Sequence, residues 1–353
     1  MSRLLLGTLL GACMACAPVV SLADAINRHS KGMQVTPNES QRRVDITFDG
    51  SPFTSYVWPT SLKKPVLYPL VAPGGITVSR GYPLEPRPGE RVDHPHHAGM
   101  WFNYGNVNGF DFWNNSDFIK AEDREKMGTI RQERIVSTKS GSDKGELVVE
   151  TVWITGKGDE LIKETTRFVF LHRADANVID RVTTLHALDR AVFRDDKEGL
   201  LGIRLAHFLE SADEKGGTFS DASGRPTKVD AADTTGATGV YLTSEGKRSA
   251  AAWGTRGRWC MLSGTSVNRP ITVAIFDHPE NPGFPTHWHA RGYGLFASNP
   301  LGDSIFDPKA PAHNFTIEKG ADATFRYRVV FYAHAVAAEE ANRESEAFVG
   351  TYK

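Results

Sequence analysis

Two short histidine clusters mark where this sequence could carry out chemistry. Five of the twelve histidines lie in residues 93–97 and 287–289, among aromatic residues, glycines and asparagines rather than along an amphipathic stripe. An imidazole titrates near neutral pH and is the commonest nitrogen ligand for metals in proteins. Clustered imidazoles cost desolvation or charge repulsion unless they share a task. The two clusters therefore indicate a functional site.

The spacing within the clusters is compatible with a metal site. Residues two apart in a strand share a face, which predicts that His94 and His96 point together and that His287 and His289 do the same. The proline between the first two favours an edge strand or a loop. Asp93 would join His94 and His96 as ligands of a divalent zinc, manganese, iron or copper ion. The alternative is that these histidines only hydrogen-bond loop backbone.

The residues that follow the first cluster favour a small polar ligand. Between residues 101 and 113, aromatic rings alternate with amides and a carboxylate: Trp101, Phe102, Asn103, Tyr104, Asn106, Asn108, Phe110, Asp111, Phe112 and Trp113. The C–H faces of sugars stack on aromatic rings, while their hydroxyls need a few placed polar groups. Trp101, Asn108 and Trp113 are therefore candidate sugar-binding residues. A packed strand, turn and strand would explain half of these aromatics without any ligand.

Composition narrows the classes of partner. The chain has 41 Lys and Arg against 42 Asp and Glu, a formal net charge of -1, and no long basic run. This balance argues against nucleic acid, whose phosphates need clustered cations. The sequence has no phosphate-binding P-loop, so no nucleotide cofactor is expected. Cys260 lies in an apolar strand-like run and is expected to be a buried thiol, with no disulfide framework.

The first 25 residues have the anatomy of a secretory signal. Arg3 is followed by an apolar, leucine-rich stretch and then by small residues. Residues 10–13 resemble a lipobox with Cys13 as the lipidated residue, and residues 23–25 offer an ordinary cleavage site; the lipobox is preferred. The stretch is too short for a transmembrane helix, and no other segment reaches about 18 apolar residues. We expect an exported protein, periplasmic or anchored to the bacterial envelope by a lipid at Cys13.

The elements that must position the histidines are β-strands. Period-two alternation on either side of a turn at residues 49–50 predicts a hairpin of strands 44–48 and 53–57. Longer β-rich segments predict an antiparallel meander over residues 129–139, 146–155, 161–172 and 177–186. Segments of about ten residues exceed the usual strand length of about five or six. They favour large twisted sheets packed face to face.

The second half continues in the same style. Further strands are expected at residues 199–208, 259–262, 271–276, 294–297, 314–317 and 324–333, and one helix at residues 336–348. Residues 216–239 are rich in Gly, Thr, Asp and Ala and predict a long surface loop. The fold expected for residues 26–353 is thus one all-β domain, a large antiparallel β-sandwich with a single C-terminal helix.

The segments around both clusters resemble the bacterial PmoA-like family. HPHHAGMWF at residues 94–102 and GNVNGFDFW at 105–113 are similar to its first signature; WHARGYGLF at 288–296 and NPLG at 299–302 are similar to its second. The resemblance covers most of the mature chain. It implies a β-rich protein of the sort associated with bacterial carbohydrate breakdown, with a sandwich similar to that of galactose mutarotases. The methane oxygenase subunit that gives the family its name is an integral membrane protein. No membrane-spanning helix is expected in this sequence, so the name is not taken to imply oxygenase activity.

The resemblance also selects site residues. The positions that match the family signatures are His94, His96, His97, Asp111, His289, Arg291 and Asn299. His287 precedes the usual Trp-His pair and is set aside, which weakens a metal site built from two histidines of each cluster.

The preferred function is that of an exported carbohydrate-active enzyme, an epimerase, a lyase or a glycoside-cleaving enzyme. His97 would take a proton next to a carbonyl or from an anomeric hydroxyl, and His289 would return one, with Asp111 as the partner carboxylate. Arg291 and Asn299 would hold the sugar or keto-sugar. A metal ion, if bound, would polarise an oxygen and stabilise an enolate.

Two other classes stay open. In a metal-dependent oxygenase or cupin-like protein, His94, His96 and His289 would bind iron or copper, but the acidic ligand expected a few residues after the first His-x-His is missing. In a non-catalytic carbohydrate-binding envelope protein, aromatic and amide groups would suffice. The clustered histidines argue against that third class.

Overall fold

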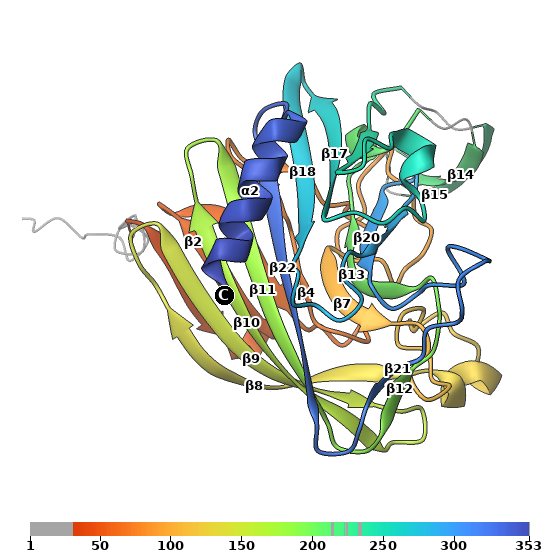
Figure 1. The fold of residues 1–353 in the computed structure, drawn as a ribbon. Coiled ribbons are helices and arrows are strands. Elements are labelled where there is room, and N and C mark those ends of the chain that lie inside the picture. The colour runs from red at the N-terminus through yellow and green to blue at the C-terminus, as the bar shows by residue number, and fades with distance from the viewer. Residues whose placement is uncertain (1–30, 213–214, 222, 224, 232–234, 353) are drawn as a thin grey trace, which may run out of the picture. The chain divides into compact units, whose positions relative to one another are not determined.

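Two large antiparallel sheets carry the fold (Figure 1). The computed structural model describes residues 31–212, 215–221, 223, 225–231 and 235–352, so the expected signal segment and Cys13 lie outside the described residues. The first sheet has the strand order β1 (Met33–Asn38), β2 (Arg43–Phe48), β3 (Ser51–Val57), β4 (Val66–Leu67), β7 (Met100–Tyr104), β13 (Gly199–Arg204), β20 (Leu295–Asn299) and β19 (His287–Ala290).

The second sheet contains the predicted meander. Its strand order is β16 (Val240–Thr243), β17 (Trp259–Ser266), β18 (Arg269–Asp277), β22 (Asp322–Tyr332), β11 (Ala176–Ala187), β10 (Glu160–His172), β9 (Lys144–Ile154) and β8 (Thr129–Lys139). The expected long strands are confirmed to within a few residues at each end. The hairpin of β2 and β3 is also confirmed.

The main core lies between the two sheets, and period-two alternation builds it. In β22, Tyr327 and Val329 point into this core, while Val330 and Tyr332 belong to a second cluster on the other face of the sheet. Both faces of this strand are buried, because the first sheet covers one side of the second sheet and other residues cover its opposite side. Cys260 in β17 is buried, as the sequence predicts. The expected all-β sandwich is confirmed.

The helix α2 (Ala338–Thr351) covers the outer face of the second sheet (Figure 1). Its Ala341 and Phe348 are fully buried and pack in the cluster that contains Val330 and Tyr332. Glu344 of the same helix accepts a hydrogen bond from Arg328 of β22 at 2.8 Å. The single predicted C-terminal helix is therefore confirmed, displaced by two or three residues. No helix among the described residues is long and apolar enough to cross a membrane.

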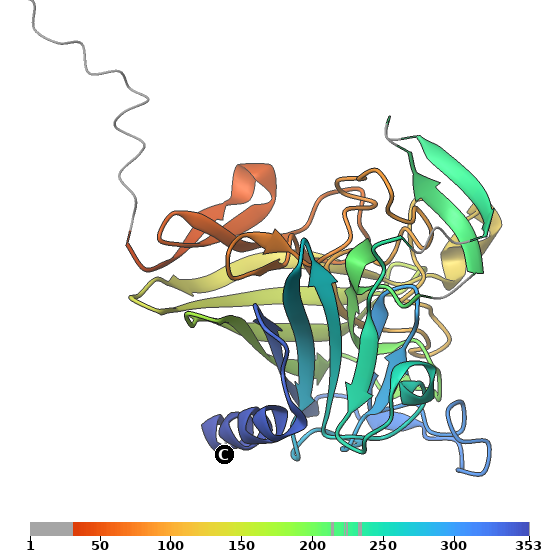
Figure 2. The same ribbon diagram turned by 90° about the horizontal axis from the view of Figure 1, so that it is seen from above.

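The expected surface loop at residues 216–239 is wrong in part. The strands β14 (Lys215–Ser220) and β15 (Pro226–Ala231) pair there as a hairpin, which Figure 2 shows apart from the two large sheets. This hairpin pairs with the segment before the first histidine cluster, through bridges at Pro88 and Arg91. The hairpin does not contribute a face to the main core, so its sequence has glycines and polar residues in place of an alternation of apolar and polar residues.

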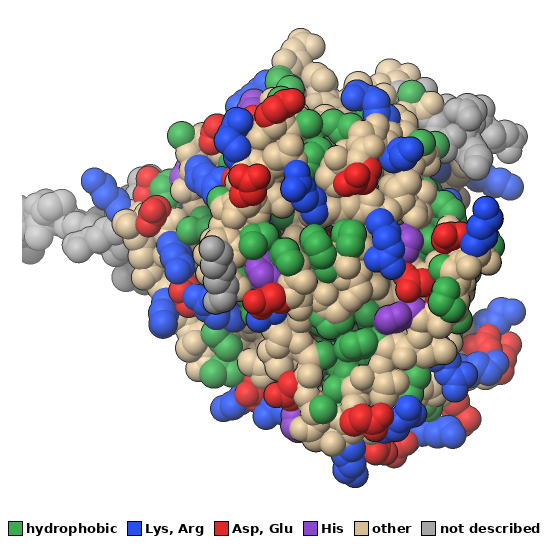
Figure 3. Space-filling model, in the orientation of Figure 1, with side chains coloured by type: hydrophobic (Ala, Val, Ile, Leu, Met, Phe, Trp, Pro, Cys, Tyr) green, Lys and Arg blue, Asp and Glu red, His purple; other side chains and the backbone are tan. Residues whose placement is uncertain are grey.

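Short elements complete the fold. Two further strand pairs are β5 (Val71–Ala72) with β6 (Ile76–Thr77) and β12 (Ala191–Phe193) with β21 (Phe315–Ile317). The 3₁₀ helices are η1 (Glu39–Gln41), η2 (Ala121–Lys126), η3 (His207–Leu209) and η4 (Ser249–Ala252). On the surface, basic and acidic side chains are interspersed over the face drawn in Figure 3.

Candidate functional site

The site lies on the face of the first sheet that points away from the second sheet. In β7, Met100 and Phe102 pack in the main core, so Trp101 between them lies on the opposite face in a separate cluster. Gly202 of the neighbouring strand β13 lies under the indole, where an added Cβ would be 2.5 Å from two ring carbons. A glycine is therefore required for these two strands to carry the Trp101 ring on this face.

The second histidine cluster reaches the same face through β19. Trp288 packs in the main core, and the rings of His287 and His289 on either side of it both contact Phe306. The prediction that these two histidines share a face of a strand is confirmed.

The first cluster forms a turn instead of a strand. The backbone N–H of His97 donates to the carbonyl of His94 at 2.9 Å, and His94 has a positive φ of 46°. The ring of His94 stacks on His97 at 4.9 Å, whereas it meets His96 edge-on. The expectation that His94 and His96 share a strand face is therefore wrong, because the proline-containing segment turns.

Arg80 holds this turn in place. Its guanidinium is almost fully buried and donates to the backbone carbonyls of Asp93, His94 and His97 at 2.8–3.0 Å. Positive φ at a non-glycine residue costs free energy, which the surrounding structure must offset. The hydrogen bonds from Arg80 supply that compensation.

Asp93 is an ionised carboxylate between two buried arginines. Its Oδ1 accepts hydrogen bonds from Arg80 at 2.6 Å and from Arg204 at 2.7 Å. Partial burial alone would raise the pKa of Asp93, but the hydrogen bond from His94 and the two guanidinium groups hold it well below its usual range. The carboxylate is therefore charged at any physiological pH.

His94 has the geometry of a general base or acid. Its Nδ1 lies 3.2 Å from Oδ2 of Asp93, and the side chain is 41% exposed. One ring face stacks on Tyr293 at 5.3 Å with an interplanar angle of 7°. With the Nδ1 proton facing the carboxylate, the lone pair lies on Nε2. No residue in the described part of the chain hydrogen-bonds that nitrogen.

His97 has no nitrogen available for a substrate. The ring is 2% exposed, with its Nε2 3.1 Å from Nε1 of Trp113 and its Nδ1 3.3 Å from Arg204. Both neighbours are donors only, so the neutral imidazole accepts from Trp113 at Nε2, and its Nδ1 is blocked by Arg204 without a hydrogen bond. Burial, followed by electrostatic interactions with His96 and Arg204, lowers the pKa of His97 well below its usual value. The geometry therefore contradicts the expectation that His97 takes the substrate's proton.

The expected sugar-stacking tryptophans are closed to a ligand. Trp101 and Trp113 are both 0% exposed. The ring of His97 stacks on Trp101 at 5.1 Å, and Trp113 packs edge-on against both. Their faces are covered by protein, so the expectation that these two rings bind sugar is wrong for this structure.

The metal site expected in the first cluster stays a prediction. Among the described residues, no group of three or more His, Cys, Asp or Glu side chains is arranged to hold a metal ion. Asp93 already accepts from two arginines, and burial followed by the positive charges of Lys64 and His94 lowers the pKa of His96 to about 2.

The second cluster contributes a buried imidazole with its own carboxylate. Nε2 of His289 lies 3.4 Å from Nε of Arg291, and Nδ1 lies 3.7 Å from Oε2 of Glu198. Since arginine only donates, the ring proton is on Nδ1, which has no hydrogen-bond partner among the described residues and has the Glu198 carboxylate as its charged neighbour. Burial, then the charges of Arg291 and Lys197, lowers the pKa of His289 to about 3. Glu198 was not singled out from the sequence, where nothing distinguishes it from other surface acids.

Tyr293 connects the two clusters. Besides stacking on His94, it lies under the Arg204 guanidinium at 4.7 Å. Burial raises the pKa of its hydroxyl; Arg204 opposes this effect, and both Glu198 and Asp93 add to it. We call Asp93 and His94 the first pair, and Glu198 and His289 the second pair. Tyr293 stacks on His94 and lies in the turn closed by the hydrogen bond from the Gly294 N–H to the carbonyl of Arg291, shortly after His289, so the two pairs border one region.

Two other predicted site residues stabilise turns. Asp111 accepts the backbone N–H groups of Trp113 and Asn114 at 2.8 and 2.9 Å. Asn108 donates to the carbonyl of Arg190 and accepts from a backbone N–H of β12, each at 2.8 Å. Their polar atoms are used within the loop, so the structure does not bring Asp111 and Asn108 to the two pairs.

Asn299 and His287 lie next to the site without facing its centre. Asn299 is fully buried and donates to the carbonyl of Asp196 at 2.8 Å, which fixes the segment that carries Glu198. Nδ1 of His287 donates to the carbonyl of Gly254 at 2.8 Å, and its Nε2 lies 3.3 Å from Asp303. His287 belongs to a separate polar cluster, in keeping with its exclusion from the predicted site.

The chain belongs to a family of unknown function, DUF6807, whose family model matches residues 43–346. This match includes all residues of the two pairs. No curated protein matches the chain. The family match does not test the PmoA-like name, which stays a prediction.

Solved structures match the chain at low identity. The α-galactosidase from Lactobacillus brevis is 11% identical with a TM-score of 0.36, over 86% of this chain and 39% of that protein. A galactose mutarotase-like protein from Clostridium acetobutylicum is 9% identical with a TM-score of 0.33, over 84% and 98%. A galactose mutarotase related enzyme from Lactobacillus acidophilus is 7% identical with a TM-score of 0.28, over 86% and 98%. The chain thus spans less than half of the first of these proteins.

Proposed function

We propose that this protein is an exported carbohydrate-active enzyme whose chemistry is proton transfer at the first pair. The observation that carries the proposal is the geometry of His94. A carboxylate orients its Nδ1, an aromatic ring supports one face, and its Nε2 is open. A positioned acid or base of this kind contributes about a hundred- to ten-thousandfold in rate.

His94 takes the role that the sequence suggested for His97. Its Nε2 accepts a proton from a carbon next to a carbonyl or from an anomeric hydroxyl, and the imidazolium that forms is stabilised by the ionised Asp93. Epimerisation and elimination both begin with such a step. Cleavage of a glycoside would use the same imidazole as a general acid.

The imidazolium of His94 returns the proton, because the ring proton of His289 is on Nδ1 and its Nε2 has none to give. The second pair instead offers an acceptor to a substrate hydroxyl. Arg291 covers Nε2 of His289, so a substrate oxygen that draws Arg291 away exposes that nitrogen. The partly exposed indole of Trp253 lies under the Arg291 guanidinium at 5.2 Å, and its buried Nε1 has no hydrogen-bond partner among the described residues. An aromatic face beside unsatisfied donors is typical of a site for sugars.

Solvent exchange tests the proposal directly. The purified protein is incubated in D₂O with mono- and oligosaccharides, including keto-sugars, and products and deuterium incorporation are followed by NMR. His94→Asn should reduce exchange or turnover by about a hundredfold or more, because asparagine keeps the positive φ but cannot accept a proton into an acid–base cycle. Full activity of this variant would contradict the proposal.

The chain offers a matched control for that variant. His186 also has a carboxylate on Nδ1, Asp322 at 2.7 Å, but it lies near the C-terminal end of β11 in the second sheet, with an exposed side chain. His186→Asn should leave exchange unchanged. A parallel series with a chelator tests the metal-dependent alternatives, since loss of activity that added divalent metal restores would place a metal in the reaction.

A further inference from the structure

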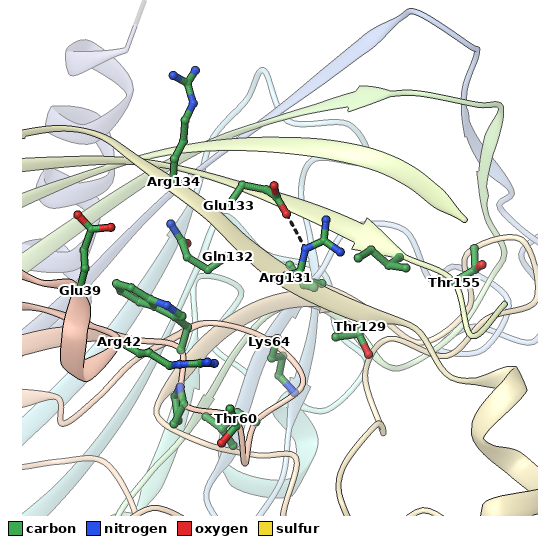
Figure 4. Close-up of a pocket in the computed structure, with 15 residues that line it drawn as sticks. Glu39, Arg42, Thr60, Lys64, Thr129, Arg131, Gln132, Glu133, Arg134 and Thr155 are labelled. Atoms are coloured by element: carbon green, nitrogen blue, oxygen red, sulfur yellow. Dashed lines mark hydrogen bonds and ion pairs between the residues drawn. The ribbon is translucent and has the colours of Figure 1, made fainter. Parts of the chain in front are cut away.

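A cavity of about 540 Å³ opens between the edge strand β8 and the loop after β3 (Figure 4). None of the residues of the first or second pair lines it. It is lined by Glu39, Arg42, Trp58, Pro59, Thr60, Leu62, Lys64, Thr129, Ile130, Arg131, Gln132, Glu133, Arg134, Ile154 and Thr155. This volume is in the range of small-molecule sites.

Hydrogen bonds fix both walls of the cavity. Ile130 of β8 donates its backbone N–H to the carbonyl of Lys63 at 2.8 Å, which ties the loop to the edge strand. The backbone N–H of Trp58 donates to the carbonyl of Arg42 at 3.0 Å. Figure 4 shows Arg42, Thr60 and Lys64 on the loop side and Arg131 and Gln132 on the opposite side. The cavity is therefore formed before any ligand enters.

The lining combines an aromatic ring with unsatisfied hydrogen-bonding groups. Trp58 is partly exposed, and its ring packs against Tyr56 at 5.5 Å. The hydroxyl of Tyr56 donates to Oε1 of Gln132, so the amide nitrogen of Gln132 is the group left over. That nitrogen is buried and has no hydrogen-bond partner among the described residues. A buried donor without an acceptor destabilises the protein, and a ligand hydroxyl that reaches this nitrogen would satisfy it.

The charges of β8 in the cavity are paired. Arg131 donates to Glu133 and Glu160, and Arg134 makes a two-pronged pair with Glu150. These ion pairs leave no block of one sign on this wall. The lining therefore does not call for a strongly charged ligand.

Three more charged side chains line the loop side of the cavity. Arg42 and Glu39 form no ion pair with any of the described residues, and Lys64 is the third. Lys64 is 4% exposed and donates to the carbonyl of His96 at 2.8 Å. The same lysine thus lines the cavity and holds the backbone of the first histidine cluster.

We propose that this cavity is a second carbohydrate-binding site, which takes a neutral mono- or disaccharide. Trp58 stacks on the C–H face of the sugar, and Gln132 and Arg42 donate to its hydroxyls. The inference needs only binding and holds whether or not the first pair is catalytic.

Calorimetric titration of the whole protein with neutral mono- and disaccharides tests the inference, with the matching uronic acids as a second series. Trp58→Ala should weaken binding of neutral sugars about tenfold or more, as expected when an aromatic contact is lost. Gln132→Leu keeps a side chain of similar size but removes the amide donor, and it should weaken binding several-fold. Phe118→Ala, a truncation of an aromatic ring that is 72% exposed outside the cavity, should leave binding unchanged.

The variant His94→Asn separates this inference from the proposed function. Sugar binding that survives His94→Asn and falls in Trp58→Ala and Gln132→Leu supports a second site, even if no turnover is found. Binding that is lost in His94→Asn and kept in both cavity variants would overturn it. So would a preference for uronic acids over neutral sugars, or an absence of neutral-sugar binding at millimolar concentration.

Discussion

Replacing Asp93 by asparagine should destabilise the protein strongly. Asp93 is the carboxylate between Arg80 and Arg204, whose side chains are 1% and 0% exposed. Without it, two buried guanidinium groups face each other with no compensating charge. Breaking a buried ion pair by removing one partner costs about 3–5 kcal/mol. We expect Asp93→Asn to lower the free energy of unfolding at pH 7 by about that amount.

The pH dependence of this effect has a definite sign. The folded-state pKa of Asp93 lies below its unfolded value, so the unfolded chain binds the proton more readily. The contribution is therefore present above the unfolded pKa of about 4 and is lost as pH falls below it toward the folded pKa. The difference between wild type and Asp93→Asn should be constant from pH 6 to 8 and shrink below about pH 4.

Urea denaturation followed by fluorescence and far-UV circular dichroism measures the change. Asp322→Asn is the control, because Asp322 pairs with His186 at an exposed position and should contribute at most about 0.5 kcal/mol. In an Arg80→Met background, Asp93→Asn should cost less, since one of the two charges it compensates is gone. An Asp93→Asn protein within 0.5 kcal/mol of wild type would refute this account of the arginine pair.

Three further predictions follow from packing and protonation. Gly202→Ala places a Cβ 2.5 Å from the Trp101 ring and should cost about 1–3 kcal/mol in urea denaturation, whereas Gly350→Ala, which has open space, should be neutral or slightly stabilising. His289 is neutral in the folded state because its pKa is lowered to about 3, so the free energy of unfolding should fall as pH drops below about 6.5. His289→Gln should reduce that slope by up to about 1.4 kcal/mol per pH unit between pH 6 and 4. Glu198→Gln removes the carboxylate beside Nδ1 of His289 and should raise the KM of any substrate found for His94 with little change in kcat, a split that a purely structural role would not produce.

The strands were predictable because their signal is local. Residues 129–187 alternate over ten or more positions, and each such segment became one of the strands β8 to β11. The strands within residues 216–239 were not predicted, because the β14–β15 hairpin pairs with a loop segment and does not pack on a sheet face. Its sequence therefore needs no alternation of apolar and polar residues. Local pattern therefore predicts strands that build the core better than strands that cover a site.

The candidate site was predictable as a location but not as a set of roles. The sequence identifies both histidine clusters, yet which imidazole is open depends on side chains from distant strands. Arg204 of β13 and Trp113 occupy the two nitrogens of His97, and neither residue is adjacent to it in sequence. Spacing rules also assume a strand for His94 and His96, where Arg80 imposes a turn. Tyr293 lies inside the second signature, but its contact with His94 spans 199 residues and has no local signal.

The two buried arginines explain why the histidine at the turn is the open one. Arg80 must reach three carbonyls at once, and it can do so only if the chain at His94 adopts positive φ. That conformation turns His94 outward over Tyr293 and directs His97 inward, where Arg204 meets its Nδ1. Arg204 and Arg80 then require a carboxylate between them, and Asp93 supplies it while also holding Nδ1 of His94. The charge that stabilises the buried arginines is thus the same charge that fixes the tautomer of the exposed imidazole, so stability and acid–base function are coupled through a single carboxylate.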